Sequence, residues 1–352
     1  MSTLIFPYTT DEAREYARQA HERGEFVVQA ASEEHDDVVY LLPTIHDENF
    51  EHDFLKIVAV HKVKRILCPV ASVHIFMRKF LAERKLDVDI KLIGESPIAR
   101  ELRLYDELIM RTQKVLPIVE KYSFGLPCLR DIEVAALLKR SSQIYGESND
   151  EKIAAMIGIF ADVRAGDVVE IGSLAGRTAF ILYSLAWAYG VGKVLTIDPW
   201  GAIEGVQKDS PPLLTEMTNE WRHDDLERIF YTNIIPLRIN DGLHLRLTSD
   251  DAFEVYDKTR VISEGDDDYY TVEYKGEISV IHIDGNHDYD RVKSDIDKWL
   301  TKMVSGGWAI IDDFQWCHGA GVTRAGNELL VERASDIEKH FVAGKALFIK
   351  FN

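Results

Sequence analysis

The stretch VVEIGSLAGRTAFILYSLAWAYGVGKVLTIDPW, residues 168–200, decides the fold of this chain. It opens with an apolar, β-branched run, turns at Gly172 and Gly176, continues as a long apolar segment, and closes with a second run that ends at Asp198. This order predicts a strand, a glycine turn, a helix and a second strand. Glycine lets the backbone turn sharply and approach a ligand, and the helix start presents free N–H groups there.

Asp198 ends the second predicted strand, near the place where an acid binds the ribose of a nucleotide in sheets of this kind. A carboxylate there can accept hydrogen bonds from both ribose hydroxyls. A helix N-cap or a turn start is the structural alternative for an Asp-Pro pair. The strict Gly-x-Gly-x-x-Gly pattern is absent between Gly172 and Gly176, which disfavours a nicotinamide cofactor.

Two later strands also end in acids. ISVIHID, residues 278–284, ends at Asp284, and GGWAIIDD, residues 306–313, ends at Asp312 and Asp313. Ligands of an open parallel sheet bind at the carboxyl ends of its strands, so these carboxylates should face the glycine turn. Carboxylate oxygens select a hard cation such as Mg²⁺. Adjacent strand residues point to opposite faces, so Asp312 and Asp313 share one ion only if the strand turns there; otherwise one of them orients a neighbour.

A histidine follows the first of these acids. His287 lies beyond Gly285, and histidine suits general-base work near neutral pH. A hydroxyl bound to a divalent cation is more acidic than a free one, so we expect His287 to take the proton of an acceptor hydroxyl. His282 lies inside the strand and is expected to be a packed core histidine, away from the ligand.

The rest of the chain suggests two α/β domains. Residues 25–100 alternate between short β-branched runs and helical periodicity, which predicts a parallel layer. We expect an N-terminal domain, 1–125, and a second domain, 126–352, with leading helices and a Rossmann-like sheet of mostly parallel strands closed by an antiparallel one. IIPLRIND, 234–241, is predicted to be a strand before Asp241. EGDDD, 264–268, is expected to be a solvated loop where a lid could sit.

Composition limits the possible partners and location. The chain has 352 residues, a net charge of -18 and three cysteines. So acidic a surface repels phosphate backbones, which argues against nucleic acid or an anionic membrane as a partner. Three scattered cysteines do not make a disulfide framework or a zinc site. The N-terminus lacks the features of a secretory signal, and no apolar stretch is long enough to span a bilayer. A cytoplasmic location is expected.

The segment E-x-G-S-x-x-G-x-T, residues 170–178, with IDPW at 197–200, resembles motifs I and II of class I S-adenosylmethionine-dependent methyltransferases. In that family the acid and the glycine turn lie by the methionine part of the cofactor, the second acid holds the ribose, and a later polar residue lies near the adenine. The resemblance therefore implies six cofactor-binding positions: Glu170, Gly172, Ser173, Gly176, Asp198 and Asp241.

Residues 281–316 resemble the metal-dependent branch of this family that methylates sugar hydroxyls in macrolide antibiotics. That branch has an Asp-Gly-x-His motif followed by an acidic pair at a similar separation. The resemblance, which covers residues 140–352, implies Asp284, Asp312 and Asp313 as metal ligands and His287 as the base. Family members often carry Glu where Asp312 stands, and the shorter side chain could alter or weaken the metal site.

These patterns predict a Mg²⁺-dependent O-methyltransferase that uses S-adenosylmethionine and acts on a hydroxyl of a sugar or sugar-bearing small metabolite. A vicinal diol could chelate the ion, and the resemblance implies a homo-oligomer. One alternative is an NAD-dependent sugar-modifying oxidoreductase; another is a non-catalytic partner-binding protein that retains the cofactor fold. Residues 25–100 faintly resemble the small domain that precedes ATP-grasp catalytic domains, and they are expected to form an acceptor-binding, lid, scaffold or dimerisation module.

Overall fold

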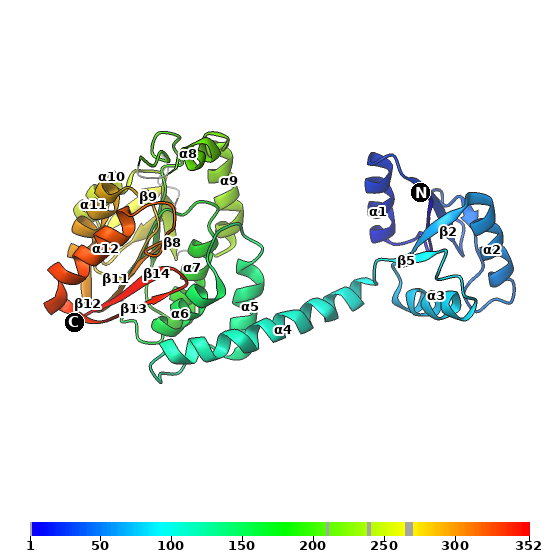
Figure 1. Ribbon diagram of the computed structural model, residues 1–352, viewed down its shortest axis with the longest axis horizontal. Helices are drawn as coiled ribbons and strands as arrows, with labels where there is room; N and C mark the ends of the chain where they lie inside the picture. The colour runs from blue at the N-terminus through cyan, green and yellow to red at the C-terminus, as the bar shows by residue number, and fades with distance from the viewer. Residues whose placement is uncertain (1, 209–210, 238–240, 265–269) are drawn as a thin grey trace. The chain divides into compact units, whose positions relative to one another are not determined.

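The computed structural model describes residues 2–208, 211–237, 241–264 and 270–352. The chain forms two compact units, Met1–Glu107 and Leu108–Asn352, each built on its own sheet (Figure 1). Most of the expected acidic loop, residues 265–268, lies outside the described residues. Within the described residues, no helix combines the length and the apolar character needed to cross a membrane.

The first unit contains a five-stranded parallel sheet in the order β3-β2-β1-β4-β5. Its strands are β1 (Ser2–Ile5), β2 (Phe26–Ala31), β3 (Tyr40–Leu41), β4 (Val63–Leu67) and β5 (Lys91–Ile93). Its connecting helices are α1 (Asp11–Glu22), α2 (Phe50–His61) and α3 (Ala71–Glu83). The expected parallel α/β layer is confirmed. The central strand β1, whose Leu4 and Ile5 are fully buried, was not predicted from the sequence.

The second unit contains a seven-stranded sheet in the order β13-β14-β12-β11-β6-β7-β8. Its strands are β6 (Asp167–Ile171), β7 (Val194–Ile197), β8 (Gly242–Leu245), β11 (Ile278–Ile283), β12 (Met303–Ile311), β13 (Ile337–Ala343) and β14 (Ala346–Phe351). β14 runs antiparallel to both of its neighbours, whereas the other pairs are parallel. The predicted Rossmann-like sheet with a final antiparallel strand is confirmed.

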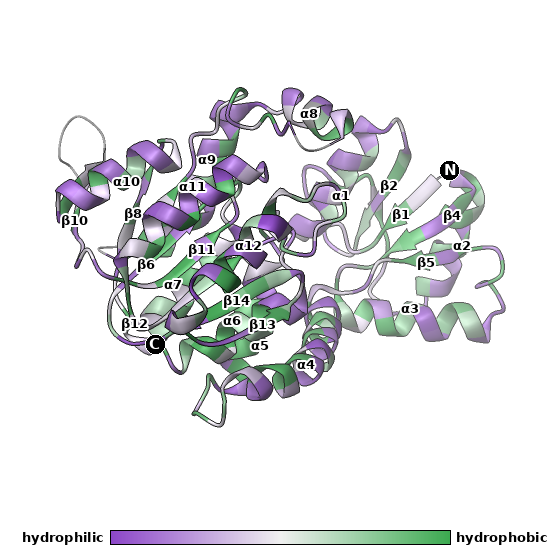
Figure 2. Ribbon diagram, turned by 60° about the vertical axis from the view of Figure 1, so that its left-hand side comes forward, coloured by the Kyte–Doolittle hydropathy of each residue, from purple (hydrophilic) through white to green (hydrophobic). Residues whose placement is uncertain are grey.

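Helices cover both faces of this sheet. One face packs against α4 (Pro97–Tyr122), α5 (Asp131–Ser141), α6 (Asp150–Phe160), α7 (Arg177–Tyr189) and α9 (His223–Ile234). The other packs against α10 (Ser249–Lys258), α11 (Tyr289–Trp299) and α12 (Gly321–Glu332), whose outer faces are hydrophilic (Figure 2). A short helix, α8 (Pro212–Asn219), follows β7, and the hairpin β9 (Val261–Glu264) and β10 (Tyr270–Glu273) follows α10.

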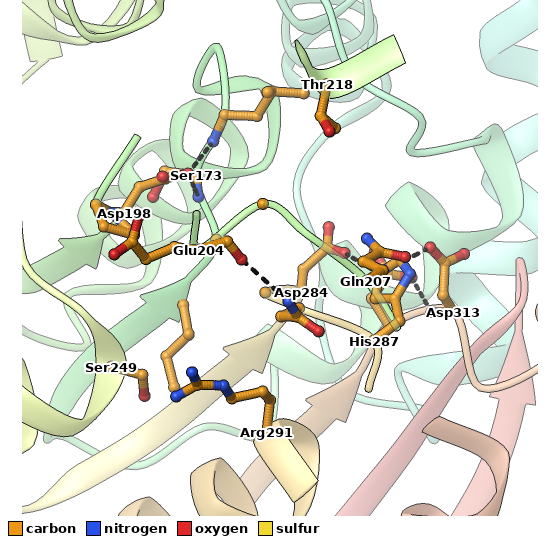
Figure 3. A pocket seen from close by; sticks show the side chains of 18 of the residues that line it. Ser173, Asp198, Glu204, Gln207, Thr218, Ser249, Asp284, His287, Arg291 and Asp313 are labelled. Carbon is orange, nitrogen blue, oxygen red and sulfur yellow. Dashed lines mark hydrogen bonds and ion pairs between the residues drawn. The ribbon is translucent and has the colours of Figure 1, made fainter. Parts of the chain in front are cut away.

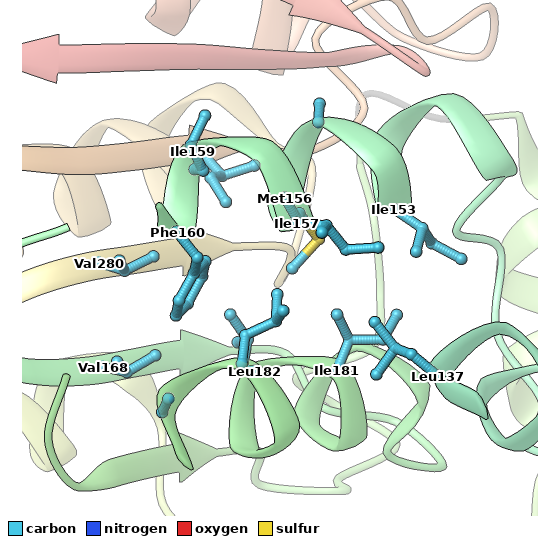
Figure 4. Close-up of a cluster of buried hydrophobic side chains, with 14 of the residues drawn as sticks. Leu137, Ile153, Met156, Ile157, Ile159, Phe160, Val168, Ile181, Leu182 and Val280 are labelled. Carbon is cyan, nitrogen blue, oxygen red and sulfur yellow. The ribbon is translucent and has the colours of Figure 1, made fainter. Parts of the chain in front are cut away.

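Helix α6 is the most buried helix of the second unit. Asn149 caps it by accepting a hydrogen bond from the Lys152 backbone N–H at 2.9 Å, as N-cap residues commonly do. Every residue from Lys152 to Phe160 is buried. Ile153, Met156 and Phe160 pack among side chains of α5, α7, β6 and β11 (Figure 4). A helix enclosed on all sides in this way is normally apolar throughout, so a lysine in its first turn requires a partner.

The units divide within α4, earlier than the expected boundary at residue 125. Val115, Val119 and Tyr122, in the second half of this helix, are buried in the core of the second unit. A Cβ added at Gly158 of α6 would lie 2.8 Å from the Val119 carbonyl oxygen, so the two helices cross in close contact. The apolar face of α4 therefore makes this half of the helix part of the second unit.

The predicted strand over residues 234–241 is wrong in its position. Ile235–Leu237 forms a 3-10 helix, residues 238–240 lie outside the described residues, and β8 begins only at Gly242. A Cβ at Gly242 would lie 2.0 Å from the Val194 carbonyl oxygen, so glycine permits the close approach to β7. Asp241 consequently precedes its strand instead of following it.

Candidate active site

A cavity of about 540 Å³ opens at the carboxyl ends of the central strands of the second unit. This volume lies in the range of small-molecule sites in proteins. The loops after β6, β7, β11 and β12 all contribute to its lining, together with α8. Ser173 and Asp198 lie on one side of it, and Asp284, His287 and Asp313 gather on another (Figure 3). The strand ends thus meet at one cavity, as an open parallel sheet predicts.

Backbone N–H groups of the glycine turn donate hydrogen bonds to Asp198. The Ser173 and Leu174 backbone N–H groups donate to Asp198 Oδ2 at 3.0 and 2.9 Å, and the Trp200 N–H donates to Oδ1 at 2.8 Å. Burial raises the pKa of the Asp198 carboxyl, and these three N–H donors oppose that rise. Asp198 therefore holds the turn in shape and also forms part of the cavity lining. Gly176 begins α7 with φ +93°.

Gly172 allows the β6 and β11 loops to touch. Its φ is +84°, and an added Cβ would lie 2.0 Å from the Asp284 carbonyl oxygen. We expect Gly172→Ala to lower the free energy of unfolding by about 2–4 kcal/mol, because it combines backbone strain with overpacking. Gly190→Ala is the matched control, since its φ is +63° but nothing lies within 4 Å of its Cβ. Equal losses in denaturant titrations of the two variants would contradict the importance of this contact.

Three predicted residues meet on one side of the cavity. His287 Nε2 lies 3.5 Å from Asp313 Oδ2 and 4.0 Å from Asp284 Oδ1. The backbone turns at Asp313, whose φ is +50°, so the strand has ended there. Asp312 and Asp313 can reach one cavity only if the strand turns in this way. Burial lowers the pKa of His287, but the nearby carboxylates outweigh burial and raise it. The Trp316 ring meets the imidazole edge-on, with centroids 4.3 Å apart.

Asp312 also lines the cavity, as predicted, but its carboxylate is paired with a buried lysine. The Lys152 ammonium, on α6, contacts Asp312 Oδ2, and only 2% of the lysine side chain is exposed. Burial alone would lower the pKa of Lys152, yet the charges of Asp312 and Asp284 raise it. Burial raises the pKa of the Asp312 carboxyl, but the charge of Lys152 outweighs burial and helps to hold this pKa well below its usual range. The sequence signal was a single lysine at the start of the apolar run IAAMIGIF, residues 153–160.

Glu170 does not line the cavity, contrary to the role inferred for it from the resemblance. It is fully buried, pairs in register with His282 on β11, and its Oε1 lies 3.6 Å from His282 Nδ1. Alternation along β6 directs Glu170 to the same face as Val168, under α6 and α7. His282 is fully buried, as expected, but its Nε2 lies 3.4 Å from Asp312 Oδ2. His282 therefore packs against the buried side of the acidic cluster, next to Asp312.

Asp241 is also placed away from the other predicted residues. It precedes β8, its carbonyl oxygen accepts the Val194 N–H at 2.8 Å, and its carboxylate lies 3.2 Å from Lys193 Nζ. This is the amino edge of the sheet, opposite the cavity. The residues that line the cavity after β8 are Thr248, Ser249 and Asp250. They were not predicted as site residues, because the strand before them was placed too early in the sequence.

The segment after β7 lines the cavity and is hydrogen-bonded to the loop that follows β11. The Asn286 side-chain amide, between Gly285 and His287, donates to the carbonyl oxygens of Glu204 and Val206 at 3.0 and 2.8 Å. The Lys208 backbone N–H donates to Asp288 Oδ2 at 3.0 Å. These bonds attach the segment after β7 to the loop after β11. Asn286 was not predicted as a site residue, and its sequence position beside His287 was the only signal.

A further carboxyl in the cavity lining gives a prediction on stability. Burial raises the pKa of Asp295 to about 7, so the folded chain keeps this proton between the unfolded-state pKa near 4 and pH 7. Stability is therefore lost as pH rises through that window, by a few kcal/mol at about 1.4 kcal/mol per pKa unit. We expect Asp295→Asn to raise the Tm at pH 8 but hardly at pH 4.5. The exposed Asp290, on the same helix, supplies the control substitution, and a pH-independent gain for Asp295→Asn would contradict the prediction.

Several side chains of the acidic cluster lie close enough together to hold a cation. Two groups of side chains have ligand atoms within 4.8 Å of one another: one of His282, Asp284 and Asp312, and one of Asp284, His287 and Asp313. Asp284 belongs to both. Carboxylate oxygens suit Mg²⁺, which usually keeps several waters and takes only one or two carboxylates. Asp284 and Asp313 fit this requirement, whereas Asp312 is already engaged by Lys152.

Comparisons with known proteins identify one domain family and several distant structures. Residues 169–314 match a family model described as a methyltransferase domain. The O-methyltransferase NovP has a TM-score of 0.43 and 16% identity over 69% of this chain and 99% of that chain. The calicheamicin methyltransferase CalS11 has a TM-score of 0.37 and 11% identity, covering 73% and 94%. Similarities this distant carry no functional conclusion. No curated protein matches the sequence.

The matched segment runs from β6 to just beyond β12 and includes the glycine turn, Asp198 and the acidic cluster. Residues 169–314 are therefore similar to a methyltransferase domain. More particularly, the resemblance to class I S-adenosylmethionine-dependent methyltransferases is confirmed, and S-adenosylmethionine is the methyl donor that the family match supports.

Proposed function

We propose that this protein is an S-adenosylmethionine-dependent O-methyltransferase that acts on a hydroxyl of a sugar or sugar-bearing small metabolite and uses Mg²⁺. The observation that carries the proposal is the single cavity lined by Ser173 and Asp198 at one end and by Asp284, His287 and Asp313 at the other. The first end matches the cofactor motif, and the second offers a base beside two carboxylates. A methyl donor and an acceptor oxygen can therefore meet inside one site.

The residues divide the chemistry between them. Bound S-adenosylmethionine supplies the methyl group, and bound Mg²⁺ makes a coordinated hydroxyl more acidic. His287 Nε2 would take the proton of the acceptor hydroxyl, whose oxygen would receive the methyl group. The electron pair of the broken carbon–sulfur bond would stay on the sulfur of the donor. Asp284 and Asp313 raise the pKa of His287. A cation that compensates their charge would lower this pKa and so favour the neutral imidazole, which can accept a proton.

The cavity lining supports a sugar as the acceptor. Trp221 and Trp316 line it together with carboxylates and amides, and aromatic rings suit the apolar faces of a sugar while polar groups suit its hydroxyls. A vicinal diol would place one oxygen near His287 and both near the acidic pair. The family resemblance on residues 281–316 favours the same class. A role for the first unit in acceptor binding or in oligomer formation remains a proposal.

The decisive test is a pair of binding titrations followed by turnover. Isothermal calorimetry should detect S-adenosylhomocysteine binding to the full chain. Transfer of a labelled methyl group should then be observed with glycosides that carry a vicinal diol, lost on chelation of Mg²⁺ and restored on its return. Tight binding of NADH with none of S-adenosylhomocysteine would favour the oxidoreductase alternative instead. Cofactor binding without transfer to any hydroxyl acceptor would favour a non-catalytic role.

A further inference from the structure

A lysine ammonium lies within the acidic cluster. Lys152 belongs to the first turn of α6, on the sheet face that also carries Glu170 and His282. Its side chain is 2% exposed and its ammonium contacts Asp312 Oδ2. Residues 153–160 of α6, which follow it, are all buried and carry no charged side chain. An ammonium is not kept in such a place without a compensating carboxylate, so Lys152 and Asp312 form a buried pair.

The contacts of Asp312 leave it little capacity for another cation. Its Oδ2 contacts the Lys152 ammonium and lies 3.4 Å from His282 Nε2. Its Oδ1 accepts the Asp313 backbone N–H at 2.9 Å. Both oxygens therefore already have proton donors. Asp284 and Asp313 differ, because their nearest described cationic group is the imidazole of His287, on the cavity side.

We propose that the Lys152 ammonium is a built-in cation of the acidic cluster: it occupies Asp312 and leaves Asp284 and Asp313 as the carboxylates that contact a divalent ion. The inference rests on the proposed function, because it concerns the ion that the proposed reaction uses. It differs from the arrangement that the family resemblance implied, in which all three aspartates are ligands. The difference arises from Lys152 and from the geometry at Asp312.

The Lys152 ammonium changes the charge that an approaching ion meets. One fixed positive charge beside the cluster cancels one carboxylate and repels a divalent cation. The ion therefore meets a site with two carboxylates and open positions, which water or a vicinal diol fills. Lys152 thus acts as a positioning residue that keeps ion affinity low before the acceptor arrives. A residue that only stabilised the fold would not influence ion affinity in this direction.

The test measures Mn²⁺ binding to the full chain by electron paramagnetic resonance, with neither cofactor nor acceptor present. Lys152→Met should bind Mn²⁺ about tenfold more tightly than the parent, because it removes the repelling charge and releases Asp312. Lys152→Arg keeps the charge and should bind Mn²⁺ as the parent does. The double variant Lys152→Met, Asp312→Asn removes both charges of the pair and should also return to the parent affinity.

The double variant decides the matter if Lys152→Met alone does not fold, since replacing both members of a buried pair is tolerated better than replacing one. Parent-like Mn²⁺ affinity in the double variant supports the proposal. A loss of tenfold or more means that Asp312 is itself an ion ligand and overturns it, as does weaker binding in Lys152→Met. Failure of the proposed function is recognised separately, because it appears as absent S-adenosylhomocysteine binding in the parent.

Discussion

Replacement of His287 by alanine is expected to lower kcat by about a hundredfold to ten-thousandfold, the usual contribution of a general base. The imidazole is the only one in the described part of the cavity that lies within 4.0 Å of both Asp284 and Asp313. Alanine cannot accept the hydroxyl proton. S-adenosylhomocysteine affinity should change little, because Ser173, Asp198 and the start of α7 lie on a different side of the cavity.

His318→Ala is the matched control for this variant. His318 lines the same cavity and contacts the same Trp316 ring, with centroids 5.3 Å apart, but its side chain is exposed. It should retain most of the turnover. Single-turnover methyl transfer separates loss of the chemical step from slow product release. Unchanged turnover in His287→Ala, or equal losses in both variants, would remove His287 from the role of base.

The site residues that could be predicted are those whose position depends on where a strand ends, because an apolar run in the sequence marks that end. Asp198, Asp284 and Asp313 were placed correctly at the cavity because an apolar run fixes where a strand ends, and parallel strands end at one edge. Asp241 was misplaced for the same reason: the strand at that position was assigned to residues before it, whereas β8 follows it. An error in one strand boundary thus moves a side chain to the opposite edge of the sheet.

The unpredicted part of the site depends on packing between distant segments. Lys152 and Asp312 are 160 residues apart in the sequence. No local sequence pattern predicts that the start of α6 packs against the end of β12. Glu170 was recognised by its motif, but its direction follows from the register with His282. The central strand β1 escaped prediction because Ser2–Ile5 is short and begins the chain. Only the assembled sheet shows that these four residues pair on both sides.

Asp284→Asn is expected to weaken Mn²⁺ binding by about a hundredfold and to lower turnover at limiting Mg²⁺ to a similar extent. Loss of an outer-shell partner of a metal ligand already costs about 10–100-fold, and the amide removes both a ligand and a negative charge. Burial and the charge of Asp312 raise the pKa of Asp284 to about 7. A cation bound beside the carboxylate would oppose this rise and favour its ionised form.

The two roles assigned to Asp284 separate in one experiment. As an ion ligand it should show a turnover defect that rising Mg²⁺ partly relieves, whereas a residue that only orients His287 should show a defect independent of Mg²⁺. Asp290→Asn, an exposed carboxylate six residues further along, should behave as the parent and controls for general loss of negative charge. If Asp284→Asn keeps parent Mn²⁺ affinity, the ion does not lie between Asp284 and Asp313. The acidic cluster would then serve the imidazole alone.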